Sequence, residues 1–360
     1  MYNIFAPVAA GALEGAAQMD LRKLVRPNVR GLRAYEARET PCCVKLDANE
    51  SPIGPALMKG MDLNRYPDPE SKALRRELAK SMSLAPENIL TGNGSDELIY
   101  YLITTFGGPV LFPTPTFVMY GIIAQALGQR PIAVPLNAEF DLDTDSMLRV
   151  VRRERPKLVF IATPNNPTGN CMSAEAILRI VETAKNTIVV VDEAYQPFAS
   201  ERGFAPLLGD YPNMVIMRTL SKIGLAALRV GYLAGDPALI GEVNKVRLPF
   251  NLNTCSQSLA VRALKDKKTM RSIVRSVVKE RVALMDALEG TAGVEPYPSE
   301  ANFILFKVAS PASVQKGLLK RGVLVRNIDA VVPGCLRVTV GTQAENRAFI
   351  RALKDTLKKG

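Results

Sequence analysis

The stretch KLVFIATPNNPTGNCMSAEAILRIVETAKNTIVVVDEAY, residues 157–195, decides the fold class. Two short and almost wholly apolar runs, residues 157–161 and 187–191, flank an amphipathic stretch over residues 174–184. Continuous apolar strands are typical of a sheet that is covered on both faces, and a helix between two such strands is typical of parallel pairing. The stretch therefore predicts a strand–helix–strand unit of an α/β fold.

The same alternation continues on both sides, with further apolar runs at residues 109–112 and 214–217. From about Ser256 the pattern changes to a long helical stretch, residues 256–288, then β-type runs at 301–306 and 335–340, and a final helix over 343–358. We predict a mainly parallel central sheet in a large domain and a smaller α+β domain. The expected division is 1–45 as an N-terminal arm and part of the small domain, 46–255 as the large domain and 256–360 as the small C-terminal domain.

The composition excludes several kinds of chemistry. The chain has 360 residues, of which 47% are hydrophobic, and it contains no histidine. A Ser-His-Asp triad, a Cys-His pair and a histidine metal ligand are therefore impossible, and we expect no metal site. Acid and base catalysis near neutral pH falls to Lys, Tyr, Cys or a carboxylate.

The net charge and the cysteines indicate which binding partners and which cellular compartment to expect. The net charge of +11 is concentrated after residue 260, where it is typical of solvated helix faces, and no nucleic-acid recognition motif accompanies it. The five cysteines form no CxxC pair, which favours free thiols in a reducing compartment. We find no apolar run long enough to span a bilayer and no basic segment typical of a signal peptide, so a cytoplasmic protein is expected, with Met19 as an alternative start.

Four motifs each have an ordinary structural interpretation when taken alone. TGNGSDE at 91–97 precedes a helical run, so it is either an anion site or a simple helix cap. TPNNPTG at 163–169 is typical of a turn. VDEAY at 191–195 places Asp192 at a strand end, where ligands bind in open α/β sheets but helix caps also occur. Lys222, in TLSKIGLAALRVGY at 219–232, is either a surface lysine or a reactive amine, and the SxxK spacing of Ser-Lys hydrolases is absent.

Together, and in this order, the four motifs resemble those of the fold-type-I pyridoxal-phosphate aminotransferases. DANESPIGP at 47–55, RYPDP at 65–69 and RPNVRGL at 26–32 followed by Tyr35 resemble the histidinol-phosphate aminotransferase branch. The resemblance extends along nearly the whole chain. It departs at residues 49–53, which are NESPI where the family often has NENPY, and at Phe117, where the family often has Tyr.

The resemblance implies pyridoxal phosphate as cofactor. Lys222 would bind the cofactor's aldehyde and move the proton at the substrate Cα, and burial beside Arg229 favours its neutral form. Asp192 would pair with the pyridine nitrogen and keep it protonated. The other implied contacts are Tyr195 and Asn166 to the ring oxygen, Gly94, Ser95, Asp96, Ser221 and Arg229 to the phosphate, Phe117 to the ring face, and Tyr66 to the phosphate bound by the other subunit.

The implied reaction interconverts histidinol phosphate and 2-oxoglutarate with imidazole-acetol phosphate and glutamate, in histidine biosynthesis, by a homodimer. Arg337 matches the substrate-anion position, and Tyr35, Asn49 and Arg326 are further candidates for substrate binding. An aromatic amino-acid aminotransferase or a phosphothreonine decarboxylase of the same fold would share nearly all these motifs. Some transcription regulators carry an aminotransferase-like domain joined to a helix-turn-helix, but here the resemblance starts near residue 20, which leaves no room for that module.

Overall fold

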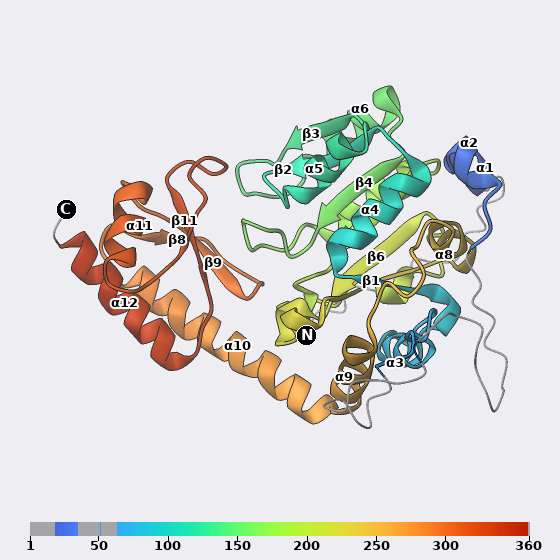
Figure 1. The fold of residues 1–360 in the computed structure, drawn as a ribbon. Helices are drawn as coiled ribbons and strands as arrows, with labels where there is room; N and C mark the ends of the chain where they lie inside the picture. Colours follow the sequence, from blue (N-terminus) through green and yellow to red (C-terminus); the bar gives the residue numbers. More distant parts are fainter. Residues whose placement is uncertain (1–18, 35–50, 52–62, 359–360) are drawn as a thin grey trace.

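The computed structural model describes residues 19–34, 51 and 63–358, so the predicted site residues Tyr35 and Asn49 lie outside the described part. Two sheets of seven and four strands lie side by side, and the long helix α10 leads from the larger one to the smaller one (Figure 1). This arrangement confirms the predicted α/β fold with a second, smaller α+β unit. The exact domain boundaries stay a prediction.

The larger sheet is mainly parallel. Its strand order is β1-β7-β6-β5-β4-β2-β3, and β7 runs antiparallel to both of its neighbours. The bounds are β1 Ile89–Asn93, β2 Val110–Thr114, β3 Pro131–Pro135, β4 Leu158–Ala162, β5 Ile188–Asp192, β6 Met214–Thr219 and β7 Val230–Gly235. Four of these strands, β2, β4, β5 and β6, lie where apolar runs predicted them.

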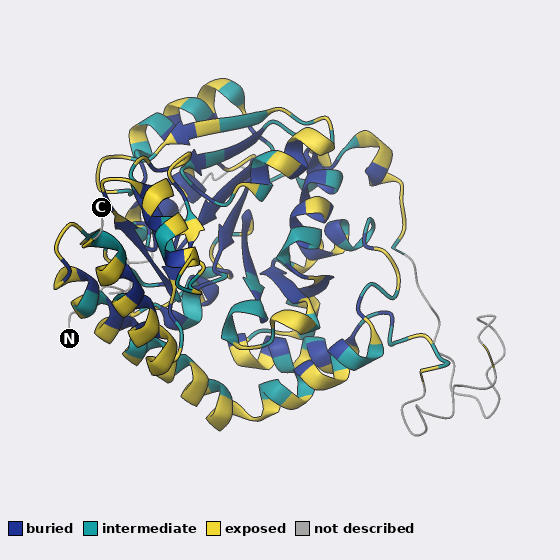
Figure 2. Cartoon of the chain, turned by 60° about the vertical axis from the view of Figure 1, so that its left-hand side comes forward, coloured by how far each residue is buried: buried dark blue, intermediate teal, exposed yellow. Residues whose placement is uncertain are grey.

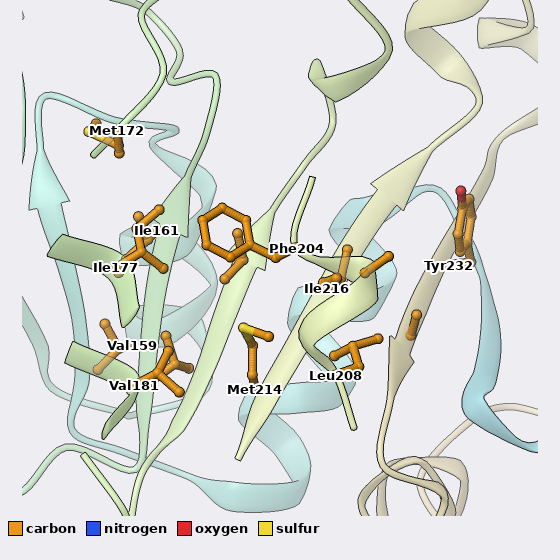
Figure 3. Packing of buried hydrophobic residues seen from close by; sticks show 14 of the residues in the cluster. Val159, Ile161, Met172, Ile177, Val181, Phe204, Leu208, Met214, Ile216 and Tyr232 are labelled. Carbon is orange, nitrogen blue, oxygen red and sulfur yellow. The ribbon is translucent and has the colours of Figure 1, made fainter. Parts of the chain in front are cut away.

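Successive side chains of each central strand point to opposite faces of the sheet, and both faces are buried. This explains why the runs are continuously apolar. In β4, Val159 and Ile161 point into one core, while Leu158 and Phe160 point into a second core on the opposite face. The pattern repeats in β5 and β6, and Figure 3 shows side chains of the first core meeting over the sheet. Since both faces are covered, neither face needs polar residues.

Helices cover each face of this sheet. One face is covered by α3 Lys72–Met82, α6 Thr144–Glu154, α7 Ala174–Thr183 and α9 Thr254–Lys265, and the other by α1 Leu21–Leu24, α2 Pro27–Arg30, α4 Ser95–Phe106, α5 Met119–Ala126 and α8 Pro237–Asn244. Leu24, Val25 and Val29 therefore pack in the core of the larger sheet, although part of residues 1–45 was assigned to the small domain. The buried sheet and exposed outer helix faces are visible in Figure 2.

The smaller sheet is antiparallel, with the order β10-β11-β9-β8. Its strands are β8 Glu295–Pro296, β9 Phe303–Lys307, β10 Arg326–Asn327 and β11 Cys335–Thr339. Its helices are α10 Lys267–Glu289, α11 Pro311–Leu319 and α12 Gln343–Leu357. Ile304, Phe306, Leu336 and Val338 pack against these helices, so Phe303 and Arg337, which alternate with them, lie on the opposite face of the sheet.

The helix expected over residues 256–288 is in fact two helices. Asp266 ends α9 and caps α10, with ψ of 65° and a carboxylate that accepts a hydrogen bond from Thr269 N at 3.1 Å. The chain turns there because the aspartate side chain replaces a backbone partner at the start of α10. None of the helices in the described residues is both long and apolar enough to span a membrane.

A buried arginine on α10 joins the two sheets. The Arg281 guanidinium donates to the carbonyl oxygens of Phe198 and Ala301 at 3.1 and 3.0 Å and pairs with Glu300 at 3.2 Å. Glu300 in turn accepts from the backbone N of Ser200 at 2.8 Å, and its own N donates to Gly169 O. These contacts connect the loop after β5 and the turn after β4 to the segment that leads into β9.

Candidate active site

The predicted motifs converge at the carboxyl ends of the parallel strands. The turn after β4, the end of β5 and the 3₁₀ turn Ser221–Ile223 after β6 lie side by side because these strands are neighbours in the sheet. They surround a cavity of about 240 Å³. Its lining includes Ser95, Asp96, Phe117, Asn166, Asp192, Tyr195, Ser221, Lys222, Arg229 and Arg337, all of which were predicted site residues.

Asp192 is a buried carboxylate at the end of β5. Its Oδ2 accepts a hydrogen bond from the Tyr120 hydroxyl at 2.6 Å, and its Oδ1 accepts one from Ala194 N at 3.0 Å. Burial raises the pKa of Asp192 to about 6. The two hydrogen bonds and the nearby Lys222 lower this pKa, but their combined effect is smaller than that of burial. Burial therefore disfavours the ionised form of this carboxylate, and the two hydrogen bonds favour it.

Lys222 has a lowered pKa. Burial is the main cause, and the positive charges of Arg337 and Arg229 act in the same direction, while the carboxylates of Asp192 and Asp96 oppose them. Its Nζ lies 5.6 Å from the centre of the Tyr195 ring. A lowered pKa increases the fraction of neutral amine, which is the nucleophilic form.

A corner with unpaired backbone donors forms where α4 begins. Gly94 is the N-cap of α4, so the backbone N–H groups of its first turn have no helical partner. Arg229 lies against this turn, with Nη2 3.7 Å from the Asp96 carboxylate and Nη1 3.4 Å from Ser221 Oγ. A Cβ on Gly94 would collide with the Arg229 guanidinium, and one on Gly231 would lie 2.6 Å from the backbone C of Gly94. Glycine at these two positions therefore allows Arg229 and the neighbouring strand to lie this close to the start of α4.

The smaller sheet supplies the opposite wall. Arg337, on β11, donates a short hydrogen bond to Oδ1 of Asn166, and its guanidinium lies 5.0 Å from the centre of the Phe303 ring. The Tyr195 ring meets the same phenylalanine edge-on at 5.1 Å. Burial lowers the pKa of Arg337, and the positive charge of Arg326 adds to that effect. Phe303 thus holds residues from both sheets against one another.

Three predicted residues of the described chain lie outside the cavity lining, and one of them, Gly94, directly precedes the lining residue Ser95. Arg326 is exposed on β10, directly opposite Arg337 in the antiparallel register. Tyr66 is 57% exposed, and its ring stacks on Phe250 at 4.6 Å.

Sequence reasoning missed Tyr120, which hydrogen-bonds to Asp192, and Phe303, whose ring contacts Tyr195 and Arg337. Tyr120 follows Phe117 by three residues, and the two rings meet edge-on although Phe117 lies just before the start of α5. Phe303 was indistinguishable from a core residue of a strand. A larger cavity of about 740 Å³ shares Pro164 with the site, but its lining in the described part of the chain contains none of the predicted site residues.

The family model for aminotransferases of class I and II matches residues 31–353, nearly the whole chain. The chain belongs to this family.

Relatives of this aminotransferase are similar along nearly their whole length. It is 44% identical to histidinol-phosphate aminotransferase 2 of Nitrosococcus oceani over 92% of this chain and 96% of the relative. It is 41% identical to the histidinol-phosphate aminotransferase of Aquifex aeolicus over 93% and 98% of the two chains.

Solved structures agree with the fold. The histidinol-phosphate aminotransferase of Sinorhizobium meliloti in complex with pyridoxal 5'-phosphate superposes with a TM-score of 0.74 at 27% identity, over 87% of this chain and 90% of that one. The L-threonine-O-3-phosphate decarboxylase of Porphyromonas gingivalis superposes with a TM-score of 0.72 at 25% identity, over 82% and 91%. The fold is therefore common to both chemistries, and the choice between them depends on the site.

We predict that Lys222 of the cofactor-free aminotransferase titrates below the ordinary pKa of a lysine. The reason is burial together with the charges of Arg337 and Arg229. The measurement is acetic anhydride labelling across a pH series, with the labelled fraction of each lysine read by peptide mass spectrometry. Arg337→Met should raise the midpoint at Lys222, because it removes a positive charge that disfavours the ammonium form.

The control is Arg351→Met, which removes an exposed arginine from α12. An ordinary midpoint at Lys222 in the parent protein would show that the cavity does not favour the neutral amine. An equal shift in both variants would show that net charge, rather than the neighbouring guanidinium, sets the midpoint.

Proposed function

We propose that this chain is a pyridoxal-phosphate-dependent histidinol-phosphate aminotransferase of histidine biosynthesis. It would interconvert histidinol phosphate and 2-oxoglutarate with imidazole-acetol phosphate and glutamate. The observation that carries the proposal is a cavity in which Lys222 and Asp192 face Arg337 across the two sheets. The names of the relatives at 44% and 41% identity support the same choice of substrate.

The residues of the cavity fit the cofactor. The open corner at Gly94, with Ser221 and Arg229, would hold a phosphate, and Asp192 would hold a protonated ring nitrogen. Phe117 would cover the ring face, and Tyr195 and Asn166 would donate to the ring oxygen. When bound, pyridoxal phosphate supplies a cationic ring that withdraws electrons from the substrate's Cα.

The protein's own groups then have distinct tasks. Lys222 would hold the cofactor's aldehyde and, when free, would move the proton at the substrate's Cα, since burial lowers its pKa and favours the neutral amine. Arg337 binds the α-carboxylate of glutamate, since a guanidinium matches a carboxylate with two parallel hydrogen bonds. Its bond to Oδ1 of Asn166 orients that amide so that the NH₂ group is the donor toward the ring oxygen.

The substrate phosphate would lie between Arg326 and Arg337. The two arginines are directly opposite on neighbouring strands, and like charges in such a pair destabilise each other. A phosphate dianion between them offsets that repulsion more fully than the single charge of an α-carboxylate does. This pair therefore favours a phosphorylated substrate over an aromatic amino acid.

We propose in addition that the enzyme is a cytoplasmic homodimer in which Tyr66 reaches the phosphate bound by the partner chain. Tyr66 does not line the cavity of its own chain, and it is held by stacking on Phe250. Tyr100 and Leu248 are also exposed large apolar side chains, and Tyr101, next to Tyr100, accepts a hydrogen bond from Leu248 N, so these two residues lie near each other. A second copy of the chain would cover such a patch.

A substrate panel tests the reaction directly. We expect kcat/KM for histidinol phosphate to exceed that for histidinol or phenylalanine by at least about tenfold, because the phosphate contacts are lost with the other two. Lys222→Ala should lose nearly all turnover, while Lys268→Ala, an exposed control on α10, should not. Product is followed as glutamate formed from 2-oxoglutarate.

Two outcomes would reject the proposal. Equal activity with phenylalanine and histidinol phosphate would indicate a general aromatic aminotransferase. Release of carbon dioxide from phosphothreonine, faster than any amino transfer, would indicate the decarboxylase.

Arg326→Gln should impair the phosphorylated substrate. A charge-assisted hydrogen bond contributes about 1.5–3 kcal/mol, so its loss should reduce kcat/KM on the order of 10- to 100-fold. Activity with histidinol should fall much less. Lys320→Gln, which changes an exposed cation at the end of α11, is the control. Equal losses with both substrates would mean that Arg326 is structural.

Mixed dimers test the position of Tyr66. Tyr66→Phe and Lys222→Ala should each be clearly impaired, but a dimer with one chain of each kind would contain one intact site. Random exchange should then recover about one quarter of the parent activity, since half of the dimers are mixed. Native mass spectrometry verifies the exchange. Mixed dimers without recovered activity would contradict a site shared between chains.

A further inference from the structure

Tyr120 is the nearest side-chain partner of Asp192 and has no place in the reaction described above. Its hydroxyl donates to Asp192 Oδ2 at 2.6 Å, and both residues are buried. The second carboxylate oxygen, Oδ1, accepts from Ala194 N at 3.0 Å. The carboxylate is therefore held at both oxygens, one by the backbone and one by a side chain.

Aromatic packing holds the Tyr120 ring in place. It stacks on Phe160 at 4.7 Å with an interplanar angle of 14°, and Phe117 meets it edge-on at 5.6 Å. Phe160 is fixed in β4 and Phe117 lines the cavity, so the ring is held between the sheet and the site. A phenol confined in this way can direct its hydroxyl only toward a partner in a defined position, and that partner is Asp192.

The hydroxyl affects the charge of the carboxylate. Burial raises the pKa of Asp192, and the Tyr120 hydrogen bond is the largest effect that lowers it. Three other titratable groups interact with Asp192: Lys222 from the turn after β6, and Glu193 and Tyr195 from the loop that follows β5. A fourth, Asp96 on α4, raises the pKa of Tyr120. Of these, Lys222 favours the ionised carboxylate, and the neighbouring Glu193 opposes it.

We propose that Tyr120 is a positioning residue that keeps Asp192 ionised and oriented for a cationic ring nitrogen. The inference depends on the proposed function, because it assumes that Asp192 meets the cofactor. Without the hydroxyl, the proton is held more strongly by the carboxyl group, so the ring nitrogen is less often the protonated partner. Tyr120 would then act on the cofactor through Asp192 without touching substrate.

The test uses Tyr120→Phe, which removes the hydroxyl and retains the ring. Protein labelled with [γ-¹³C]aspartate is titrated in its cofactor-free form, and the Asp192 signal is assigned from Asp192→Asn. We expect the Asp192 midpoint to rise by on the order of one pH unit. In the cofactor-loaded protein, the variant should also bind the cofactor less tightly as the pH is lowered from 8 to 6, measured by equilibrium dialysis.

Tyr232→Phe is the matched control. Tyr232 is also a buried tyrosine, and its hydroxyl interacts with Arg218 instead of Asp192. The control should leave the Asp192 midpoint in place even if it lowers thermal stability. An unmoved midpoint in Tyr120→Phe, or an equal rise in both variants, would overturn the proposal.

A second variant covers the case in which Tyr120→Phe does not fold. Replacing Tyr120 by 3-fluorotyrosine makes the phenol a stronger donor, so the Asp192 midpoint should fall, and an unmoved midpoint would overturn the proposal. The titration contains no substrate. Failure of the histidinol-phosphate assay would therefore leave this result standing, and failure of the titration would leave the assay standing.

Discussion

The structure depends on one buried carboxylate. Asp192 closes a strand whose other residues are apolar and fully buried, and placing a charge there costs free energy unless it is compensated. The compensation comes from the hydrogen bonds that the Tyr120 hydroxyl and the backbone N–H of Ala194 donate to the carboxylate. Parallel neighbours β4, β5 and β6 make this possible, because their carboxyl ends meet at one edge of the sheet.

The second sheet completes the site with positive charge. Arg337 comes from the face of the smaller sheet that its helices leave uncovered, and Phe303 holds it beside Tyr195. Arg281 and Glu300 hold the loops of both sheets at the same junction. The site is thus a carboxylate and an amine from one sheet, facing a guanidinium from the other. That charge distribution suits a cofactor with a cationic ring and a substrate with anionic groups.

The central strands were predictable because both faces of the sheet are covered, which leaves runs such as residues 157–161 continuously apolar. Strands β1, β3 and β7 were not predicted. In β1 and β7, Gly92, Gly231 and Gly235 weaken the pattern, and Gly231 is needed because a Cβ there would meet the backbone of Gly94. The break at Asp266 depends on a local cap that periodicity does not reveal. The motifs after each strand led to the site residues, since ligands bind at strand ends. Tyr120 and the pairing of Arg326 with Arg337 depend on tertiary packing and strand register, which the sequence alone does not specify.

The most direct test of the account is the protonation state of the cofactor's ring nitrogen in the assembled protein. Protein reconstituted with pyridoxal phosphate labelled with ¹⁵N in the ring is measured by nitrogen NMR near pH 7.5. We expect the chemical shift of a protonated pyridinium in the parent protein and of a neutral pyridine in Asp192→Asn. A neutral ring nitrogen in the parent protein, with the cofactor bound at Lys222, would contradict the role of the buried carboxylate.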